Sequence, residues 1–214
     1  MSTTGRAAKV QLEHRLETAR HGARLLDRKQ HLLADQLEQL QRREGMAREE
    51  WQGRARDAAL WLGRSSALDG SARIAAAAPL ETATAAFRWG NAMGVRYPED
   101  PQCRLPELPA AGGSSALTFA AEVHQSALLA GIRDGVLQRS QQLLAAELAA
   151  TRTRQRAVER RWIPRLETEL QAIRRQLDAQ ELEESLRLRW AADRTRGETA
   201  PTAGNTVPTG ALST

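Results

Sequence analysis

The stretch LEHRLETARHGARLLDRKQHLLADQLEQL, residues 12–40, decides the fold, because its seam residues, apolar except for Gln30, recur in alternating steps of four and three. This spacing is the heptad pattern of a helix that pairs with another helix along one apolar seam. Carried forward, it reaches Trp51, Ala58 and Trp61, so we predict one helix over residues 9–66 after a short extension, residues 1–8. Such a helix is roughly 85 Å long at 1.5 Å per residue. The predicted seam of this helix includes Leu12, Leu16, Leu26, Leu33 and Leu37.

Helical periodicity returns after Ser115, a candidate N-cap, and continues to residue 194. The seam of this second helix is predicted to run along Leu137, Gln141, Leu144, Leu148, Thr151, Gln155, Val158 and Trp162, and then along Leu166, Leu170, Ile173 and Leu177. It slips by one residue near Pro164, and a proline inside a helix costs roughly 3 kcal/mol. We predict a kink or local unwinding there. The alternative is that Ile163 ends one helix and Pro164 begins another.

Residues 67–114 differ from both helices because they concentrate glycine and proline, which predicts turns, a possible short helix and a β-hairpin. The tail, residues 195–214, is rich in threonine, glycine and proline and is predicted to be disordered. The fold class is therefore all-α: a long antiparallel two-helix coiled coil with a short irregular or β-hairpin-like middle segment. If residue 10 pairs with about residue 190, Glu38 and Glu44 meet Arg160 and Arg156.

Composition supports an elongated helical body. Only 4% of the 214 residues are aromatic, whereas large compact cores draw on more aromatic mass. The net charge is +5, and the chain's single cysteine, Cys103, excludes an internal disulfide and a thiolate metal cluster and suits a reducing compartment. No apolar run approaches the roughly 20 residues that span a bilayer, so we expect neither a secretory leader nor insertion into a membrane.

The residues carry no recognisable catalytic chemistry. The four histidines form no metal-binding motif, no phosphate-binding glycine loop is present, and we therefore expect no catalytic residue, no metal and no cofactor. The clearest electrostatic feature is a run of arginines, in which Arg152, Arg156 and Arg160 share one helical stripe. The run is either a solvated helix flank or a contact for an acidic protein surface. Nucleic acid is less favoured, because no aromatic residues interleave with the arginines as stacking platforms.

Three segments carry a family resemblance. AAKVQLEHRLETARHGARLLDRKQHLL, residues 7–33, resembles the opening of the D subunit of the V-type (archaeal and bacterial A/V-type) ATPases, with Gly22, Leu25–Leu26 and Arg28–Lys29 in the family's order. TRQRAVERRWIPRLETELQAIRRQLDAQELEESLRL, residues 153–188, is similar to the family's C-terminal helix, including its Ile-Pro-x-Leu signature at residues 163–166. GNAMGVRYP, residues 90–98, looks like part of its middle region. Trp162 departs from the family, because a smaller residue is expected there.

The resemblance implies a non-catalytic central stalk, or rotor, that binds no nucleotide itself. Its implied partners are the ring of A and B subunits, the small F subunit, and the C (d) subunit on the membrane ring that carries protons or sodium ions. The implied location is cytoplasmic, peripheral to the inner face of the cell membrane. Arg152, Arg156 and Arg160 become candidates for contact with the ring, and Pro164 becomes a source of asymmetry in the axle. A self-associating coiled-coil scaffold and a basic nucleic-acid binder are the alternatives.

Overall fold

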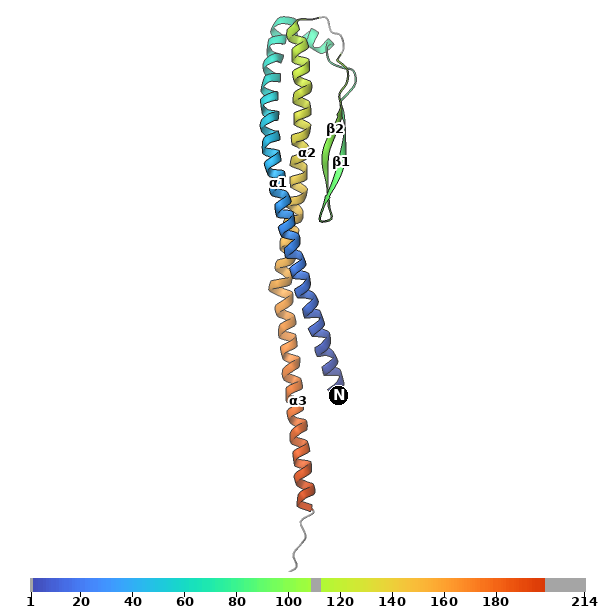
Figure 1. The fold of residues 1–214 in the computed structure, drawn as a ribbon, viewed down its shortest axis with the longest axis vertical. Coiled ribbons are helices and arrows are strands. Elements are labelled where there is room, and N and C mark those ends of the chain that lie inside the picture. The colour runs from blue at the N-terminus through green and yellow to red at the C-terminus, as the bar shows by residue number, and fades with distance from the viewer. Residues whose placement is uncertain (1, 109–112, 199–214) are drawn as a thin grey trace, which may run out of the picture. The chain divides into compact units, whose positions relative to one another are not determined.

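The computed structural model describes residues 2–108 and 113–198, and Figure 1 shows two long helical segments joined through a two-stranded sheet. Helix α1 is Ser2–Ala76, strand β1 is Thr84–Ala92 and strand β2 is Val95–Arg104. Helix α2, Ser115–Ala157, leads into a π-helical turn, Val158–Trp162, and then into helix α3, Ile163–Glu198. The predicted fold class, two long helices with a hairpin between them, is confirmed.

The helices extend beyond the ranges expected from the sequence. Helix α1 already includes Ser2 and continues to Ala76, although its backbone leaves the helical region at Gly70, with φ 75° and ψ 163°. Positive φ suits glycine because it has no Cβ to clash with the backbone. Helix α3 continues through Glu198, and the rest of the tail that was predicted to be disordered, residues 199–214, lies outside the described residues.

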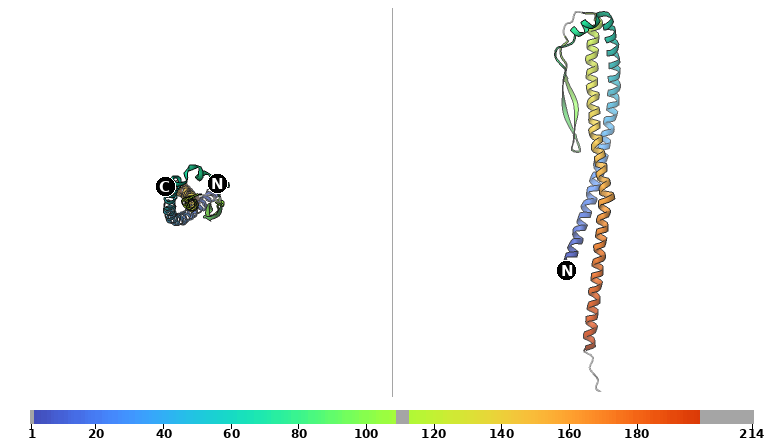
Figure 2. Two further views of the ribbon diagram at one scale, coloured as in Figure 1. Left: turned by 90° about the horizontal axis from the view of Figure 1, so that it is seen from above. Right: turned by 180° about the vertical axis from the view of Figure 1, so that it is seen from behind.

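The chain divides into two compact units. The terminal unit contains the described residues 2–20 and 160–198, and the middle unit contains residues 21–108 and 113–159. Helix α1 therefore contributes its first turns to the terminal unit and the remainder to the middle unit. In the middle unit, α1 and α2 run antiparallel side by side and the hairpin lies along them, as Figures 1 and 2 show from two sides.

The core of the middle unit lies between α1, α2 and the hairpin. Its buried residues come from all three of these elements: Leu33, Leu40, Tyr97, Leu144 and Leu148. Beside this core, the Lys29 ammonium donates to Glu147 Oε1 at 2.7 Å, and this hydrogen bond holds the pKa of the Glu147 carboxyl below its usual value. Farther along the pair, Trp61 meets Phe119 in an edge-to-face contact with ring centroids 4.5 Å apart.

The start of α2 is fixed by a cap. The N-cap is Ser114, not the expected Ser115, and its side chain accepts a hydrogen bond from the Leu117 amide. Asp69 on α1 accepts from both the amide and the hydroxyl of Ser114, at 2.8 and 2.5 Å. These two hydrogen bonds lower the pKa of the Asp69 carboxyl, the hydroxyl contributing most. The turn that leads into α2 is thus tied directly to α1.

In the terminal unit, the first turns of α1 pack against α3. The buried cluster is Leu12, Leu16, Ala19, Leu166 and Leu170, with Ile163 and Ile173 against it. Three exposed ion pairs flank it: Arg20 with Glu167 at 2.6 Å, Arg174 with Glu13 at 2.7 Å and Arg6 with Glu181 at 3.2 Å.

These ion pairs correct the expected register. In each of them the two residue numbers add up to 187, so the expected pairing of residue 10 with residue 190 is wrong by 13 residues. Glu38 and Glu44 do not meet Arg160 and Arg156 in ion pairs; they bind Arg42 and Arg48, one turn ahead in their own helix. The three exposed ion pairs of the terminal unit contribute under about 1 kcal/mol each, so they cannot fix a register by themselves.

The burial of the seam predicts a contrast between two leucines of the same helix. Leu33 has no exposed surface, whereas Leu25 is 54% exposed. Leu33→Ala leaves a cavity in the seam and should lower the free energy of unfolding by about 2–5 kcal/mol. Leu25→Ala is the control and should change it by under about 1 kcal/mol. Urea denaturation of the full chain followed by circular dichroism measures both, and equal losses would contradict the assignment of the core.

Candidate functional site

The candidate site is the outer surface of the paired helices together with the seam that holds them. Among the described residues, no three histidine, cysteine or acidic side chains gather where a metal ion could bind. Features that can contact another molecule include the exposed cations of α2 and the π-helical turn, the irregularity before Pro164, the hairpin, and a largely apolar cavity.

The seam residues named from the sequence lie between the helices. Leu12, Leu16, Leu33, Leu166, Leu170 and Leu177 are buried, and Leu26, Leu37 and Ile173 are half-buried. Leu177 closes the seam against Gly5, where a Cβ would lie 3.0 Å from Leu177 Cδ2. These contacts give each unit a continuous line of apolar packing that resists separation of its two helices.

The π-helical turn explains the slip in the heptad pattern. Trp162, which the spacing placed in the seam, is 48% exposed, and the neighbouring Ile163 packs into the terminal cluster in its place. The step from half-buried Val158 to Ile163 is thus five residues, which is the hydrogen-bond spacing of a π-helix. Steps of three and four resume at Leu166. One extra residue is absorbed in this turn, and the apolar stripe stays on the side of α1 in each unit.

Pro164 lies in the first turn of α3, directly after the π-helical turn. Proline is tolerated at such a position because the first amides of an α-helix have no partner within that helix. The backbone stays helical from Ser115 to Glu198, which matches the alternative of one helix with a local change of winding. A new α-helical segment nevertheless begins at Ile163, directly before Pro164, which is close to the alternative of two helices. The Pro164 carbonyl accepts a hydrogen bond from Thr168 Oγ1 at 2.9 Å.

The arginine run lies on the surface. Arg152 and Arg156 are exposed on α2, and Arg160 is exposed in the π-helical turn. Within the described part of the chain, none of these three makes an ion pair, whereas Arg165 binds Glu169 at 2.8 Å. Arg154 binds Glu147 at a looser 3.6 Å. Three cations without carboxylate partners are therefore available to an acidic surface of another protein.

The hairpin is seated on the helices through β2, which sequence reasoning did not identify. Tyr97 is buried, and that burial, with the adjoining Glu99 carboxyl, raises the pKa of the phenol to about 12. Ser140 on α2 is also buried, and its Oγ lies 2.7 Å from the Pro98 carbonyl oxygen and 2.8 Å from the Val136 carbonyl oxygen, so its single hydrogen is shared between these two acceptors. The available signal was the chain's only tyrosine, placed beside a proline in a turn-rich segment.

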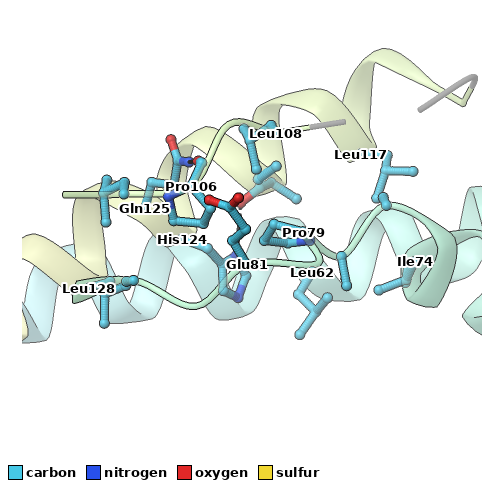
Figure 3. Close-up of a pocket in the computed structure, with 16 residues that line it drawn as sticks. Leu62, Ile74, Pro79, Glu81, Pro106, Leu108, Leu117, His124, Gln125 and Leu128 are labelled. Carbon is cyan, nitrogen blue, oxygen red and sulfur yellow. Dashed lines mark hydrogen bonds between the residues drawn. The ribbon is translucent and has the colours of Figure 1, made fainter. Parts of the chain in front are cut away.

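A largely apolar cavity of about 480 Å³ lies at the end of the middle unit (Figure 3). It was not predicted from the sequence. Leu62, Leu117 and Leu128 contribute to its wall, and Glu81 is among the few polar residues that line it. Two further polar residues already have partners: Gln125 donates to the Pro106 carbonyl at 3.2 Å, and His124 Nδ1 lies 2.8 Å from the Ala120 carbonyl. The bond from Gln125 to Pro106 ties the segment after β2 to α2, whereas the contact of His124 lies within α2.

In each unit two helices pair along an apolar seam, which defines a coiled-coil protein of the helical-hairpin class. More narrowly, the chain belongs to the family of the ATP synthase D subunit, because the model of that family matches residues 9–193. Members of this family are stalk subunits of rotary ATPases. The resemblance found in the sequence is thereby confirmed. No curated protein matches the chain.

Across the described residues, no helix contains an apolar stretch that meets the length and hydropathy needed to span a bilayer.

The five-residue step predicts how the helix responds to deletions. Deleting Arg161 makes the step four residues but places Pro164 inside an α-helix, so the free energy of unfolding should fall by about 3 kcal/mol. Adding Pro164→Ala to the Arg161 deletion should restore most of the lost free energy of unfolding. Deleting the exposed Gln171 is the control, because it rotates Ile173 and Leu177 off the seam and no substitution at Pro164 can compensate. Thermal melting of the full chains checks this, and a double variant no more stable than the single deletion would contradict it.

The buried phenol predicts a dependence of stability on alkaline pH. The folded pKa of Tyr97 is raised from 10 to about 12, so the unfolded chain releases the proton first. Its contribution to stability therefore changes between pH 10 and 12: the unfolded state gains by ionising there, and the folded chain is destabilised as the pH rises through this window. Tyr97→Phe, which has no proton to release, should remove this component. The measurement is the difference in unfolding free energy between the two chains at pH 9–12. The single tyrosine also allows direct ultraviolet titration, and a midpoint near 10 would contradict the assignment.

Proposed function

We propose that this chain is the non-catalytic central-stalk, or rotor, subunit of a V-type ion-translocating ATPase. In this role it transmits rotation between a ring of A and B subunits, which hydrolyses or makes ATP, and a membrane ring that carries protons or sodium ions. The observation that carries the proposal is the family match over residues 9–193, which spans both long helices and the hairpin between them.

The contacts within each unit suit a part that bears torque. In the terminal unit, Leu166 and Leu170 interlock with Leu12 and Leu16, and ion pairs flank this packing. Such packing resists sliding of one helix along the other, because each apolar side chain fits between residues of the facing helix. A turning moment applied to one helix is therefore shared by its neighbour.

The outer surface offers the contacts that the ring would need. Arg152, Arg156 and Arg160 present positive charge without carboxylate partners among the described residues, and we assign them to acidic surfaces of the A and B subunits. The π-helical turn and Pro164 interrupt the regular helix at one place. An axle with such an irregular surface can present different contacts to three chemically identical sites, whereas a symmetric rod cannot.

The remaining partners follow from the same role. We propose that the chain binds the small F subunit and is seated on the C (d) subunit above the membrane ring. It would then act on the cytoplasmic side of the cell membrane, peripheral to the inner face and without direct contact with nucleotide.

The experiment is reconstitution of the A and B subunits with and without this chain, together with the F and C subunits and the membrane ring in vesicles. ATP-driven ion uptake should require the chain. In contrast, a self-associating scaffold would sediment as a homomeric complex and would leave ion uptake unaffected. That result would overturn the proposal.

The arginines provide a sharper prediction within this assay. Arg152, Arg156 and Arg160 changed together to glutamine should leave helicity unchanged but lower ATP-driven ion uptake severalfold at low salt, because attraction to acidic surfaces is lost. The difference from the original chain should shrink near 1 M salt, where charges are screened beyond about 3 Å. The control replaces Arg42, Arg54 and Arg187, exposed arginines already paired with glutamates in their own helices. Equal effects of the two triple variants would assign Arg152, Arg156 and Arg160 to a solvated flank.

A further inference from the structure

Strand β1 is the exposed strand of the hairpin. Residues 84–89 and Asn91 are exposed, and only Gly90 and Ala92 are half-buried. Strand β2 instead packs against α2 and buries Tyr97 and Pro98. The hairpin is thus anchored through β2. One edge of β1 pairs with β2, and most of its other edge has no neighbouring strand.

The backbone groups at the free edge of β1 follow from the register. Trp89 lies opposite Pro98, which has no amide hydrogen, so these two residues cannot exchange a pair of hydrogen bonds. Opposed residues in an antiparallel ladder alternate between bonded and non-bonded pairs. Gly90 with Tyr97 and Arg88 with Glu99 are therefore the bonded pairs. It follows that the amides and carbonyls of Phe87, Trp89 and Asn91 point away from β2.

The two outer edges of the hairpin differ in how well they are protected against pairing with a further strand. Strand β2 carries Pro98 and Pro101 and contacts α2. Proline and charged residues on an edge strand prevent pairing with another chain. Strand β1, TAAFRWGNA, has no proline and a single charged residue, Arg88. It therefore presents an edge of nine residues with little protection against a further strand.

Side chains along this edge are of the kind that recognises proteins. Phe87 is 43% and Trp89 56% exposed, and the Arg96 guanidinium lies over the Trp89 ring at 5.6 Å from its centroid. Tryptophan and arginine are enriched among the residues that dominate binding at protein interfaces. An exposed strand edge beside aromatic side chains is the arrangement to which extended peptides add as a new strand.

Charge indicates the kind of strand that fits. On the hairpin, Asp100 already binds Arg88, and Glu99 lies against the Tyr97 phenol. In the described part of the chain, Arg96 and Arg104 have no carboxylate partner. The excess charge on the hairpin is positive, which favours an incoming strand with carboxylates.

We propose that the edge of β1 is a docking site for an extended, acidic strand of a different polypeptide, which adds to the hairpin as a third strand. A second copy of this chain fits less well, because complete antiparallel overlap of two β1 strands would place Arg88 opposite itself. Like charges directly opposite destabilise a strand pair. The proposal goes beyond the stalk role and does not depend on it.

The test uses the full chain and a fluorescent seven-residue peptide that alternates valine with glutamate, with fluorescence anisotropy as the measurement. The peptide should bind saturably. The same peptide N-methylated at every amide has no backbone donor and cannot form the ladder, and one with lysine in place of glutamate reverses the charge. Both should bind roughly tenfold more weakly or worse, because each lost hydrogen bond or charge contact weakens binding.

Variants of the chain locate the site. Trp89→Lys places a charge on the edge and removes the aromatic surface, and it should abolish saturable binding while helicity and melting temperature are retained. The matched control is Met46→Lys, at a helical residue 66% exposed in the same unit, and it should bind as the original chain does. Binding that is insensitive to N-methylation, or equal in both variants, would overturn the proposal. So would sedimentation as a dimer that Trp89→Lys dissociates, because the occupant would then be a second copy. No ATPase subunit takes part, so failure here leaves the stalk role standing.

Discussion

In each of its two units the structure depends on a narrow line of contact, the apolar seam between α1 and the helix that returns along it. The leucines that are covered, such as Leu33 and Leu144 in the middle unit and Leu166 in the terminal unit, lie on this line. Burying such a side chain contributes about 1.5–3 kcal/mol, compared with under about 1 kcal/mol for each flanking ion pair. The seam therefore sets the pairing, and the charged residues modify it.

Dependence on a seam makes the helix intolerant of a phase error, and the π-helical turn is the consequence. An apolar stripe with one extra residue would turn by about 100° if the helix stayed regular, since an α-helix has 3.6 residues per turn. Ile163 and Leu166 would then leave the partner helix. The wider turn at Val158–Trp162 absorbs that residue and turns Trp162 to the surface. Pro164 follows where its missing amide hydrogen matters least. The proline and the slip therefore have one structural cause.

The sequence predicted the elements better than their alignment. Leucine spacing was enough for both helices, and glycines and prolines were enough for the hairpin. The register failed for a physical reason: a heptad pattern indicates which face of a helix pairs but not how far the two helices are shifted along each other, and the expected pairing was wrong by 13 residues. Only particular contacts, such as Asp69 with the Ser114 cap, distinguish one alignment from another. Trp162 was misplaced because periodicity alone assumes an α-helix throughout. The seat of the hairpin on Ser140 and the cavity beside Leu117 needed tertiary structure.

The distribution of aromatic residues separates what folds the chain from what it can bind. Among its eight aromatic side chains, only Tyr97 is buried, and it holds the hairpin to the helices. Trp51, Trp89, Trp162, Trp190 and both phenylalanines are exposed. The exposed part of such a large apolar side chain contributes little to folding, since burial is what makes it favourable, although Phe119 still packs against Trp61. Aromatic residues are, however, enriched at protein interfaces. A chain that builds its seam from leucine and alanine and places its tryptophans outside has a surface suited to other proteins.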